Sequence, residues 1–456
     1  MRFLALSDTA WGWSSIISDQ VRAYAFIVYL LLLLAIGWKI MSSFIISKSE
    51  NPQTASVGRW QTVVAGFYLG LMCIQYWPIE GYGTSLIKVA FMCLAPVVLL
   101  FSLRYGVHWK GIACVAACLT WKFMVAVCQS TSFRPEGLAY SVAFFITYLM
   151  FYTLVQNGCF TLSQARSLLE SLLWAFVIVL IIQQAYSLAG GGEWALINLN
   201  GARLHVLKCQ SLTQEPSSSA RIMGAMFYAL LKIWEYQKGK RLSVGDLWSE
   251  HRWITVGFLY AMISMHSATA IFVLMLLMLY FFSWKYMLPI ILVFFLLPTF
   301  AEVTESNELR RVIAVAESMS TGDREAVIQA DGSASYRVLS ILGMFNADYT
   351  DIHLWIGHGA DSWHNLLEEN PYAQSELLPG VLEFGLIDYM LALFLVWCCC
   401  IVPANSLPTL MFFCGVGGST NNVAYMWGIL MIFTIVSYFY KKSVNMKKVV
   451  SDDKQT

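Results

Sequence analysis

The chain has 456 residues, of which 58% are hydrophobic and only 12% are charged, and its formal net charge is +1. Soluble globular domains carry about 25% charged residues, so this composition excludes a soluble domain. The near-zero net charge gives no indication of a nucleic-acid partner. The apolar runs lack the alternation that a membrane β-barrel requires, so we predict an all-α polytopic membrane protein.

Apolar length predicts about 12 or 13 membrane spans, because a helix needs about 20 residues to cross the hydrocarbon core. The expected spans are roughly 22–46, 60–77, 84–102, 107–128, 137–156, 168–189, 219–235, 252–266, 268–284, 286–300, 379–401, 405–418 and 421–440. Those at 252–266 and 405–418 are short enough to be broken or re-entrant helices. The chain therefore divides into a helix bundle over 1–300, a long loop over 301–378, and membrane helices with a tail over 379–456.

Basic residues in the short connections predict the orientation of these spans. KKSVNMKK near the C-terminus and QKGKRLSVGDLWSEHR between two spans are rich in lysine and arginine, as cytoplasmic loops are. Lys48 and Arg59 flank another such loop, and Arg104 and Lys110 a third. Counting spans from these loops places the N-terminus outside. It also places the smaller connection near 190–218 and the long loop on the periplasmic side.

The long loop over 301–378 is expected to be ordered. Loops of this length are usually functional or disordered. The stretch ELRRVIAVAESM has helical patterning, and tryptophans and tyrosines recur through the loop. Disordered segments are poor in aromatic residues. We therefore expect a folded cap that lies against the periplasmic face of the membrane.

The stretch SLTQEPSSSARIMG, residues 211–224, stands where the smaller connection enters a membrane helix. Pro216 suits the first turn of a helix, and the serines at 217–219 can satisfy free backbone N–H groups. One interpretation is therefore helix initiation, with Arg221 reaching the lipid headgroups. Helix initiation does not require a carboxylate, however, and ionisable residues at such depth are functional candidates. Glu215 and Arg221 are accordingly candidates for binding or deprotonating a polar substrate.

Further arginines lie in the two predicted periplasmic connections. NGARLHVLK contains Arg203, DGSASYRV contains Arg337, and Arg310 and Arg311 stand in tandem. The planar guanidinium pairs bidentately with phosphate oxygens. Each arginine alone can also be a solvated loop charge or pair with a nearby glutamate. Together, on one membrane face with few acids between them, these arginines favour binding of a diphosphate headgroup.

The end of the long loop, WIGHGADSWHNLLEEN, carries residues that can exchange protons, namely His358, Asp361 and His364. A loop histidine is also often structural or simply exposed. The chain contains no HExxH, GxSxG or P-loop pattern, and no cysteine, histidine or acidic cluster with metal-ligand spacing. This argues against hydrolase, NTPase and metal-dependent chemistry on that side, and no metal or cofactor is expected.

The order of these features along the chain is also informative. Many membrane helices are followed by EPS before a helix, then by a large outer loop with SASYR, GHG and HN, and then by LEFGLIDY leading into a helix. This order resembles the O-antigen polymerase and O-antigen ligase superfamily across most of the chain. The resemblance implies a GT-C-like glycosyltransferase of the bacterial inner membrane. It further implies an undecaprenyl-diphosphate-linked oligosaccharide donor, with a chain-length regulator as a candidate partner.

The resemblance also separates the two branches of the superfamily. In the ligase branch, a histidine–asparagine pair lies about nine residues before the glutamate of an E-x-G-L motif. Here Glu383 begins that motif, and Gln374 occupies the matching position. The pair His364–Asn365 lies nineteen residues before Glu383, so either the loop carries an insertion or the ligase-type histidine is absent. The EPS segment therefore favours a polymerase.

A polymerase mechanism assigns a role to each candidate residue. The donor is already activated, so catalysis needs an oriented acceptor hydroxyl and charge stabilisation on the leaving diphosphate. Glu215 is the preferred general base and His364 the second choice. The arginines that would hold the diphosphate are Arg203, Arg221, Arg310, Arg311 and Arg337. The alternatives are a ligase that transfers the polysaccharide to lipid A-core, and a polysaccharide flippase, against which the long ordered loop argues.

Overall fold

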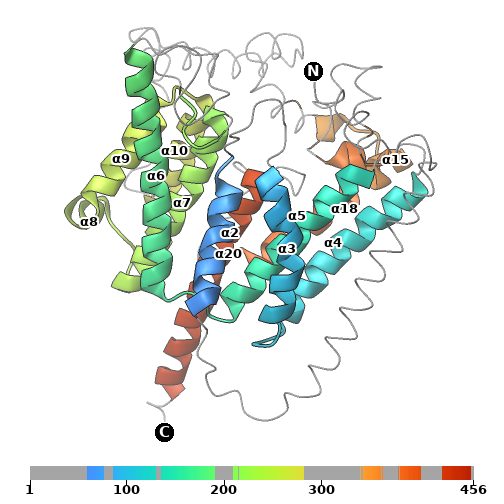
Figure 1. Cartoon of the computed structure of the whole chain (residues 1–456), viewed down its shortest axis with the longest axis horizontal. Helices are drawn as coiled ribbons and strands as arrows, with labels where there is room; N and C mark the ends of the chain where they lie inside the picture. Colours follow the sequence, from blue (N-terminus) through green and yellow to red (C-terminus); the bar gives the residue numbers. More distant parts are fainter. Residues whose placement is uncertain are drawn as a thin grey trace.

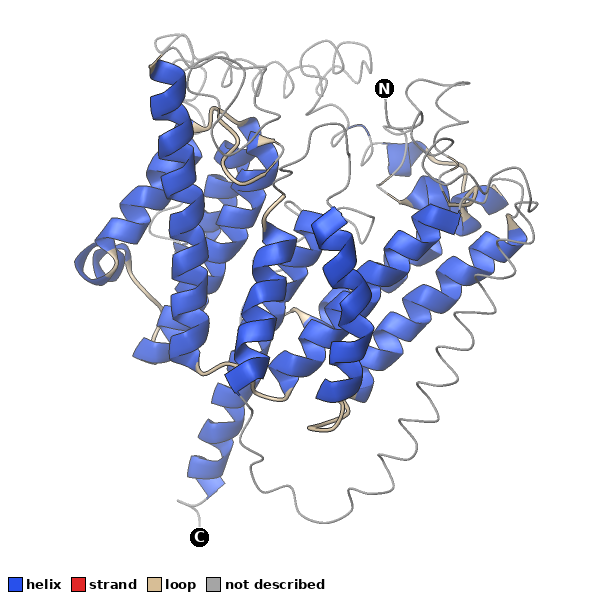
Figure 2. Ribbon diagram, in the orientation of Figure 1, coloured by secondary structure: helices blue, strands red, loops and turns tan. Residues whose placement is uncertain are grey.

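The computed structural model describes residues 59–75, 86–129, 135–189, 209–213, 215–281, 339, 343–360, 362, 378, 380–401 and 424–452. Within them every regular element is a helix (Figure 2). The helices are α2 (Arg59–Cys73), α3 (Leu86–Ser102), α4 (Trp109–Cys128), α5 (Pro135–Gln156), α6 (Leu162–Leu188), α7 (Pro216–Lys238), α8 (Val244–Glu250), α9 (Arg252–Ser264), α10 (Ala268–Phe281), α15 (Ile352–Ile356), α18 (Val381–Cys399) and α20 (Ala424–Asp452). This agrees with the predicted all-α class.

Four of the described helices are long and apolar enough to cross a membrane: Trp109–Cys128, Gly137–Gln156, Leu162–Leu188 and Val381–Cys399. Shorter apolar stretches occur in α2, α3 and α10. Helix α9 has 13 residues and is therefore about 20 Å long, which confirms that this segment is short for a span. The spans expected at 22–46, 286–300 and 405–418 lie outside the described residues, so the total of about 12 or 13 stays a prediction.

The described parts of the predicted cytoplasmic connections lie at one end of the bundle. Thr62 at the start of α2 donates to the carbonyl of Cys159 between α5 and α6, at 2.5 Å. His108 before α4 lies 2.9 Å from the Asn157 side chain after α5. Tyr236 near the end of α7 packs against Tyr440 of α20. In Figure 1 this is the end from which α20 projects. The basic residues predict that these connections lie on one side of the membrane, which agrees with their position at one end of the bundle. Which side of the membrane that end faces stays a prediction.

Helix α7 is the central element of its half of the bundle. It is buried from Ser218 to Trp234 apart from Arg221, because α6, α10 and α20 pack around it. Pro216 occupies its first turn, as predicted, and Gly239 ends it with a left-handed φ of 71°. Its N-terminal end points away from the basic connections. The EPS segment therefore stands at the opposite end of the bundle.

Candidate functional site

The loop before α7 is held by side chains of neighbouring helices. Ser211 has a left-handed φ of 59°, which is unusual for a residue with a side chain. Gln183 of α6 fixes it, donating to its carbonyl at 3.0 Å and accepting from its N–H at 2.7 Å. The N–H of Gln75 after α2 donates to the carbonyl of Leu212 at 2.8 Å. The approach to Glu215 is thus attached to two helices.

Glu215 is the N-cap residue of α7, but its side chain makes no capping hydrogen bond. Its main-chain carbonyl accepts from the N–H groups of Ser218 and Ser219, at 3.1 and 3.2 Å. Its exposed carboxylate accepts from the Ser217 hydroxyl at 3.0 Å. The helix therefore begins without using the carboxylate. The carboxylate makes no hydrogen bond to the N–H groups of the first turn and remains exposed, so it is accessible to a substrate.

The serines after Pro216 act differently from the prediction that they satisfy free N–H groups. The Ser217 hydroxyl donates to the Glu215 carboxylate, and the Ser219 hydroxyl donates to the Gln210 carbonyl at 2.5 Å. These two hydroxyls thus join the first turn of α7 to the loop before it. Arg221 follows in the second turn of α7 and is half-buried.

Helix α18 is broken inside the E-x-G-L motif. Gly385 has φ 78° and ψ 171°, so the helix cannot continue through it. In an unbroken helix the three carbonyls before Gly385 would accept from N–H groups four residues later. Here the Leu382 and Glu383 carbonyls accept from the N–H groups of His358 and Gly359, both at 2.9 Å. The span expected at 379–401 agrees with α18, and the break at Gly385 is a feature that apolar length does not predict.

The third freed carbonyl is satisfied by α4. The Trp121 indole N–H donates to the Phe384 carbonyl at 2.9 Å. Gln129 at the end of α4 lies 3.5 Å from the Gly357 carbonyl. Since buried carbonyls are rarely left without donors, the break, the loop before it and α4 depend on one another.

Two glycines permit this close approach. Gly357 has φ 76°, and a Cβ there would collide with the backbone of Glu383. A Cβ on Gly385 would collide with the Trp355 carbonyl. Any larger residue would also be strained at a positive φ. The GHG and E-x-G-L motifs, predicted separately, thus form one structural unit with α15.

His358 lies within this unit and is half-buried. Its ring meets that of His353 edge to face, with 4.6 Å between centroids. Burial lowers the pKa of His358 below its usual range, the neighbouring His353 lowers it further, and Asp351 opposes both effects. The imidazole is therefore neutral at neutral pH, when it can act as an acceptor or a donor.

Acidification is expected to loosen the unit through His358. Because the folded-state pKa is lowered, the unfolded loop binds protons more readily, so stability is lost as the pH falls below about 6.5. Hydrogen exchange should show that protection of the His358 and Gly359 amides, corrected for intrinsic rates, decreases between about pH 7.5 and 5.5. His358→Gln should remove most of this pH dependence. Equal pH dependence in both proteins would contradict the assignment.

A buried ion pair lies directly below the helix break. The Lys122 ammonium donates to Asp388 Oδ2 at 2.8 Å, and the two side chains are 0% and 4% exposed. The ammonium also stands 3.6 Å from the centre of the Phe384 ring. Asp388 Oδ1 is buried and accepts no hydrogen bond from the described residues. The pair joins α4 to the second half of α18, one turn from Gly385.

Several predicted residues lie outside the described part of the chain: Arg203, Arg310, Arg311, Arg337, Asp361 and His364. Their assembly with Glu215 therefore stays a prediction. Figure 1 shows the start of α7 and α15 on opposite sides of α2 and α3. Helix α7, which Glu215 precedes, is thus separated in this view from α15 by α2 and α3. Among the described residues, no three His, Cys, Asp or Glu side chains form a metal-binding group.

Sequence analysis overlooked Lys122 and Asp388, although a signal was present. Lys122 interrupts the apolar run GIACVAACLTWKFMVAVC, and Asp388 interrupts LIDYMLALFLVWCCC. Ionisable residues inside membrane segments are expected to pair with one another.

The described residues define an all-helical protein with helices long and apolar enough to span a membrane. Comparison of the chain with family models, with curated proteins and with solved structures gives no match.

Proposed function

We propose that the chain is an O-antigen polymerase, a glycosyltransferase that joins undecaprenyl-diphosphate-linked oligosaccharide repeat units on the periplasmic side of the bacterial inner membrane. The observation that carries the proposal is the joining of the GHG and E-x-G-L motifs by main-chain hydrogen bonds. These motifs came from the family resemblance, and nothing in their spacing along the chain required them to meet. The EPS turn follows a loop that is attached to α2 and α6 and lies at the same end of the bundle, and this supports the proposal further.

The chemistry needs no nucleotide, because the diphosphate-linked sugar is already activated. The acceptor hydroxyl must lose its proton as the glycosidic bond forms, and Glu215 is the proposed base, with His364 as the second candidate. The departing diphosphate carries the negative charge. The proposed ligands for it are Arg203, Arg221, Arg310, Arg311 and Arg337. Apolar helices would hold the polyprenyl tails.

The proposal is tested with the full chain purified into lipid vesicles. Lipid-linked repeat units alone should be converted into a ladder of longer lipid-linked chains, seen on a gel. Transfer only when lipid A-core is added would instead identify a ligase. Movement of the lipid-linked unit across the vesicle membrane, without a new bond, would identify a transporter. Either outcome would overturn the polymerase assignment.

A further inference from the structure

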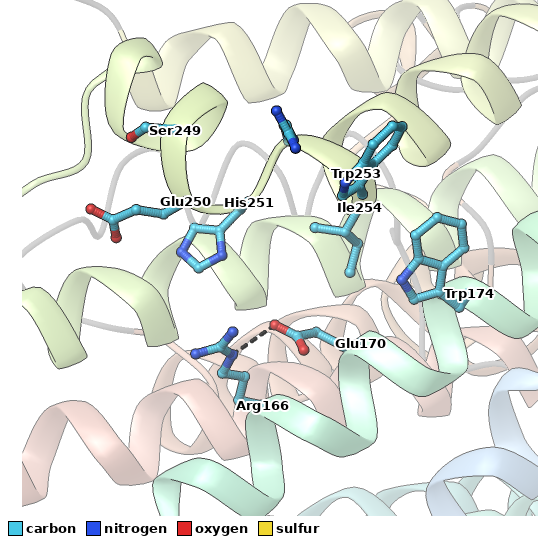
Figure 3. A pocket seen from close by; sticks show the side chains of 9 residues that line it. Arg166, Glu170, Trp174, Ser249, Glu250, His251, Trp253 and Ile254 are labelled. Atoms are coloured by element: carbon cyan, nitrogen blue, oxygen red, sulfur yellow. Dashed lines mark hydrogen bonds and ion pairs between the residues drawn. The ribbon is translucent and has the colours of Figure 1, made fainter.

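A pocket lies at the end of the bundle that carries the basic connections, away from Glu215 and from the helix break. It measures about 460 Å³, a size typical of small-molecule sites. It opens between the first turns of α6 and the connection from α8 to α9 (Figure 3). The lining residues are Arg166, Glu170, Trp174, Ser249, Glu250, His251, Arg252, Trp253 and Ile254. Nothing in the proposed polymerisation uses them.

The charges of the pocket are balanced, with two arginines and two glutamates among the lining residues. Arg166 Nε donates to Glu170 Oε1 at 2.7 Å. The Trp234 indole donates to the same oxygen at 3.3 Å, so neither bond uses Oε2. Glu250 accepts from Lys238 at 2.5 Å. The pocket therefore offers guanidinium donors and a carboxylate acceptor side by side.

His251 and Arg252 complete the polar lining. The His251 ring stacks on Trp234 at 3.8 Å, with 6° between the ring planes. Burial lowers the pKa of His251, and Arg166 lowers it further, while Glu170 and Glu250 oppose this. Arg252 is exposed and lies over the Trp253 ring at 5.1 Å, and it forms no ion pair in the part of the chain described. Its guanidinium is thus available to a phosphate.

The walls of the pocket continue into a surface suited to lipid tails. Trp174 packs against Gly257, where a Cβ would lie 3.2 Å from the indole, so α6 and α9 approach closely. Trp253 is 68% exposed, and indole rings at this level are typical of the membrane interface. Exposed apolar side chains then follow along both helices: Ile178, Ile181, Ile182, Val256, Leu259 and Ile263. A polar pocket beside an exposed apolar surface fits a ligand that has a polar headgroup and apolar chains.

We infer that the pocket binds one phospholipid with a zwitterionic headgroup carrying a phosphodiester and a primary ammonium, as in phosphatidylethanolamine. The phosphodiester lies against Arg252 and Arg166, and the ammonium donates to Glu170. A purely anionic headgroup would bring its own charge close to Glu170 and Glu250 and would supply no donor for Glu170 Oε2. A quaternary ammonium has no N–H to donate to a carboxylate. The chains lie along the exposed faces of α6 and α9.

The inference is tested on the full chain, purified and mixed with equal amounts of phosphatidylethanolamine, phosphatidylcholine and phosphatidylglycerol. Native mass spectrometry then measures the fraction of protein that retains one lipid of each kind. Phosphatidylethanolamine should be retained roughly tenfold better than the others, the size expected for one hydrogen bond to a charged group. Arg252→Ala should lower that retention about tenfold. Lys240→Ala removes the same charge from an exposed position outside the pocket and should leave retention unchanged.

Glu170→Gln tests recognition of the ammonium separately from recognition of the phosphodiester. It keeps the size of the side chain but replaces the charged acceptor with a neutral amide, so the preference for phosphatidylethanolamine over phosphatidylcholine should fall several-fold while lipid remains bound. Soluble phosphoethanolamine at millimolar concentration should not displace the lipid, because it lacks the chains. Equal losses in Arg252→Ala and Lys240→Ala, or equal retention of the three lipids by the unmodified protein, would overturn the inference. Displacement by phosphoethanolamine would identify a soluble ligand and overturn the lipid assignment.

Discussion

Glu215→Gln is expected to slow glycosyl transfer by about 10²–10⁴-fold, the contribution of a positioned general base. Glutamine keeps the size of the side chain and can still accept from Ser217, but it cannot take the acceptor proton. Because α7 begins without the carboxylate, the protein should fold and reach the membrane normally. The measurement is the rate of ladder growth with purified protein and lipid-linked repeat units, beside donor binding, which should be unchanged.

Two variants control this result. Glu215→Asp keeps the charge with a shorter reach and should retain part of the activity. Ser217→Ala removes the hydroxyl that contacts the carboxylate and should change the rate far less than the loss of the carboxylate does. Normal ladders from Glu215→Gln would exclude it as the base and favour His364. A fall in membrane levels with an unchanged specific rate would show a structural role instead.

Lys122→Met is expected to lower the free energy of unfolding by about 3–5 kcal/mol, because it leaves Asp388 buried without its counter-ion. Both side chains are almost completely buried, so water cannot replace the ammonium. The loss should concentrate at α18 and the helix break. The measurement is unfolding of the purified protein in detergent, followed by circular dichroism.

A second substitution tests whether the loss of stability comes from the unpaired charge of Asp388. Lys122→Met combined with Asp388→Leu removes both charges and should recover most of the lost stability, since an apolar pair of similar volume replaces the ion pair. Lys232→Met is the matched control. Lys232 is as buried as Lys122, but its partner Glu235 has a side chain 21% exposed and also accepts from Tyr280, so the loss should be smaller. A double variant as unstable as Lys122→Met alone would contradict the role given to the buried ion pair.

Helices that form long apolar runs could be predicted from the length of those runs. The spans expected at 107–128 and 137–156 agree with α4 and α5 to within a few residues. The span expected at 168–189 lies within α6 but for its last residue, and the helix begins earlier because its first turn is polar. The capping box of Thr161 with Gln164 begins the helix at Leu162. Helix α8 was missed for the same reason, although Ser243 and Asp246 form another capping box.

The features that depend on distant partners could not be predicted in this way. The break at Gly385 is stable because donors from His358, Gly359 and Trp121 reach the freed carbonyls, and Trp121 lies 263 residues from Phe384 along the chain. Lys122 and Asp388 are separated by 266 residues. Their charges were visible in the sequence, but their pairing follows from the packing of α4 on α18. Glu215, by contrast, was identified locally, because a proline follows it at a helix start.

The break at Gly385 also bears on how the protein sits in its lipid surroundings. After the break, α18 runs from Leu386 to Cys399, about 21 Å at 1.5 Å per residue, whereas a typical hydrocarbon core is about 30 Å thick. A short hydrophobic stretch is accommodated by a locally thinner bilayer. The GHG and E-x-G-L unit would then lie at the floor of a depression in the bilayer surface. For the polymerase proposed above, a polyprenyl-linked donor would enter that depression sideways from the lipid, and the acyl-chain length of the surrounding membrane would then affect turnover.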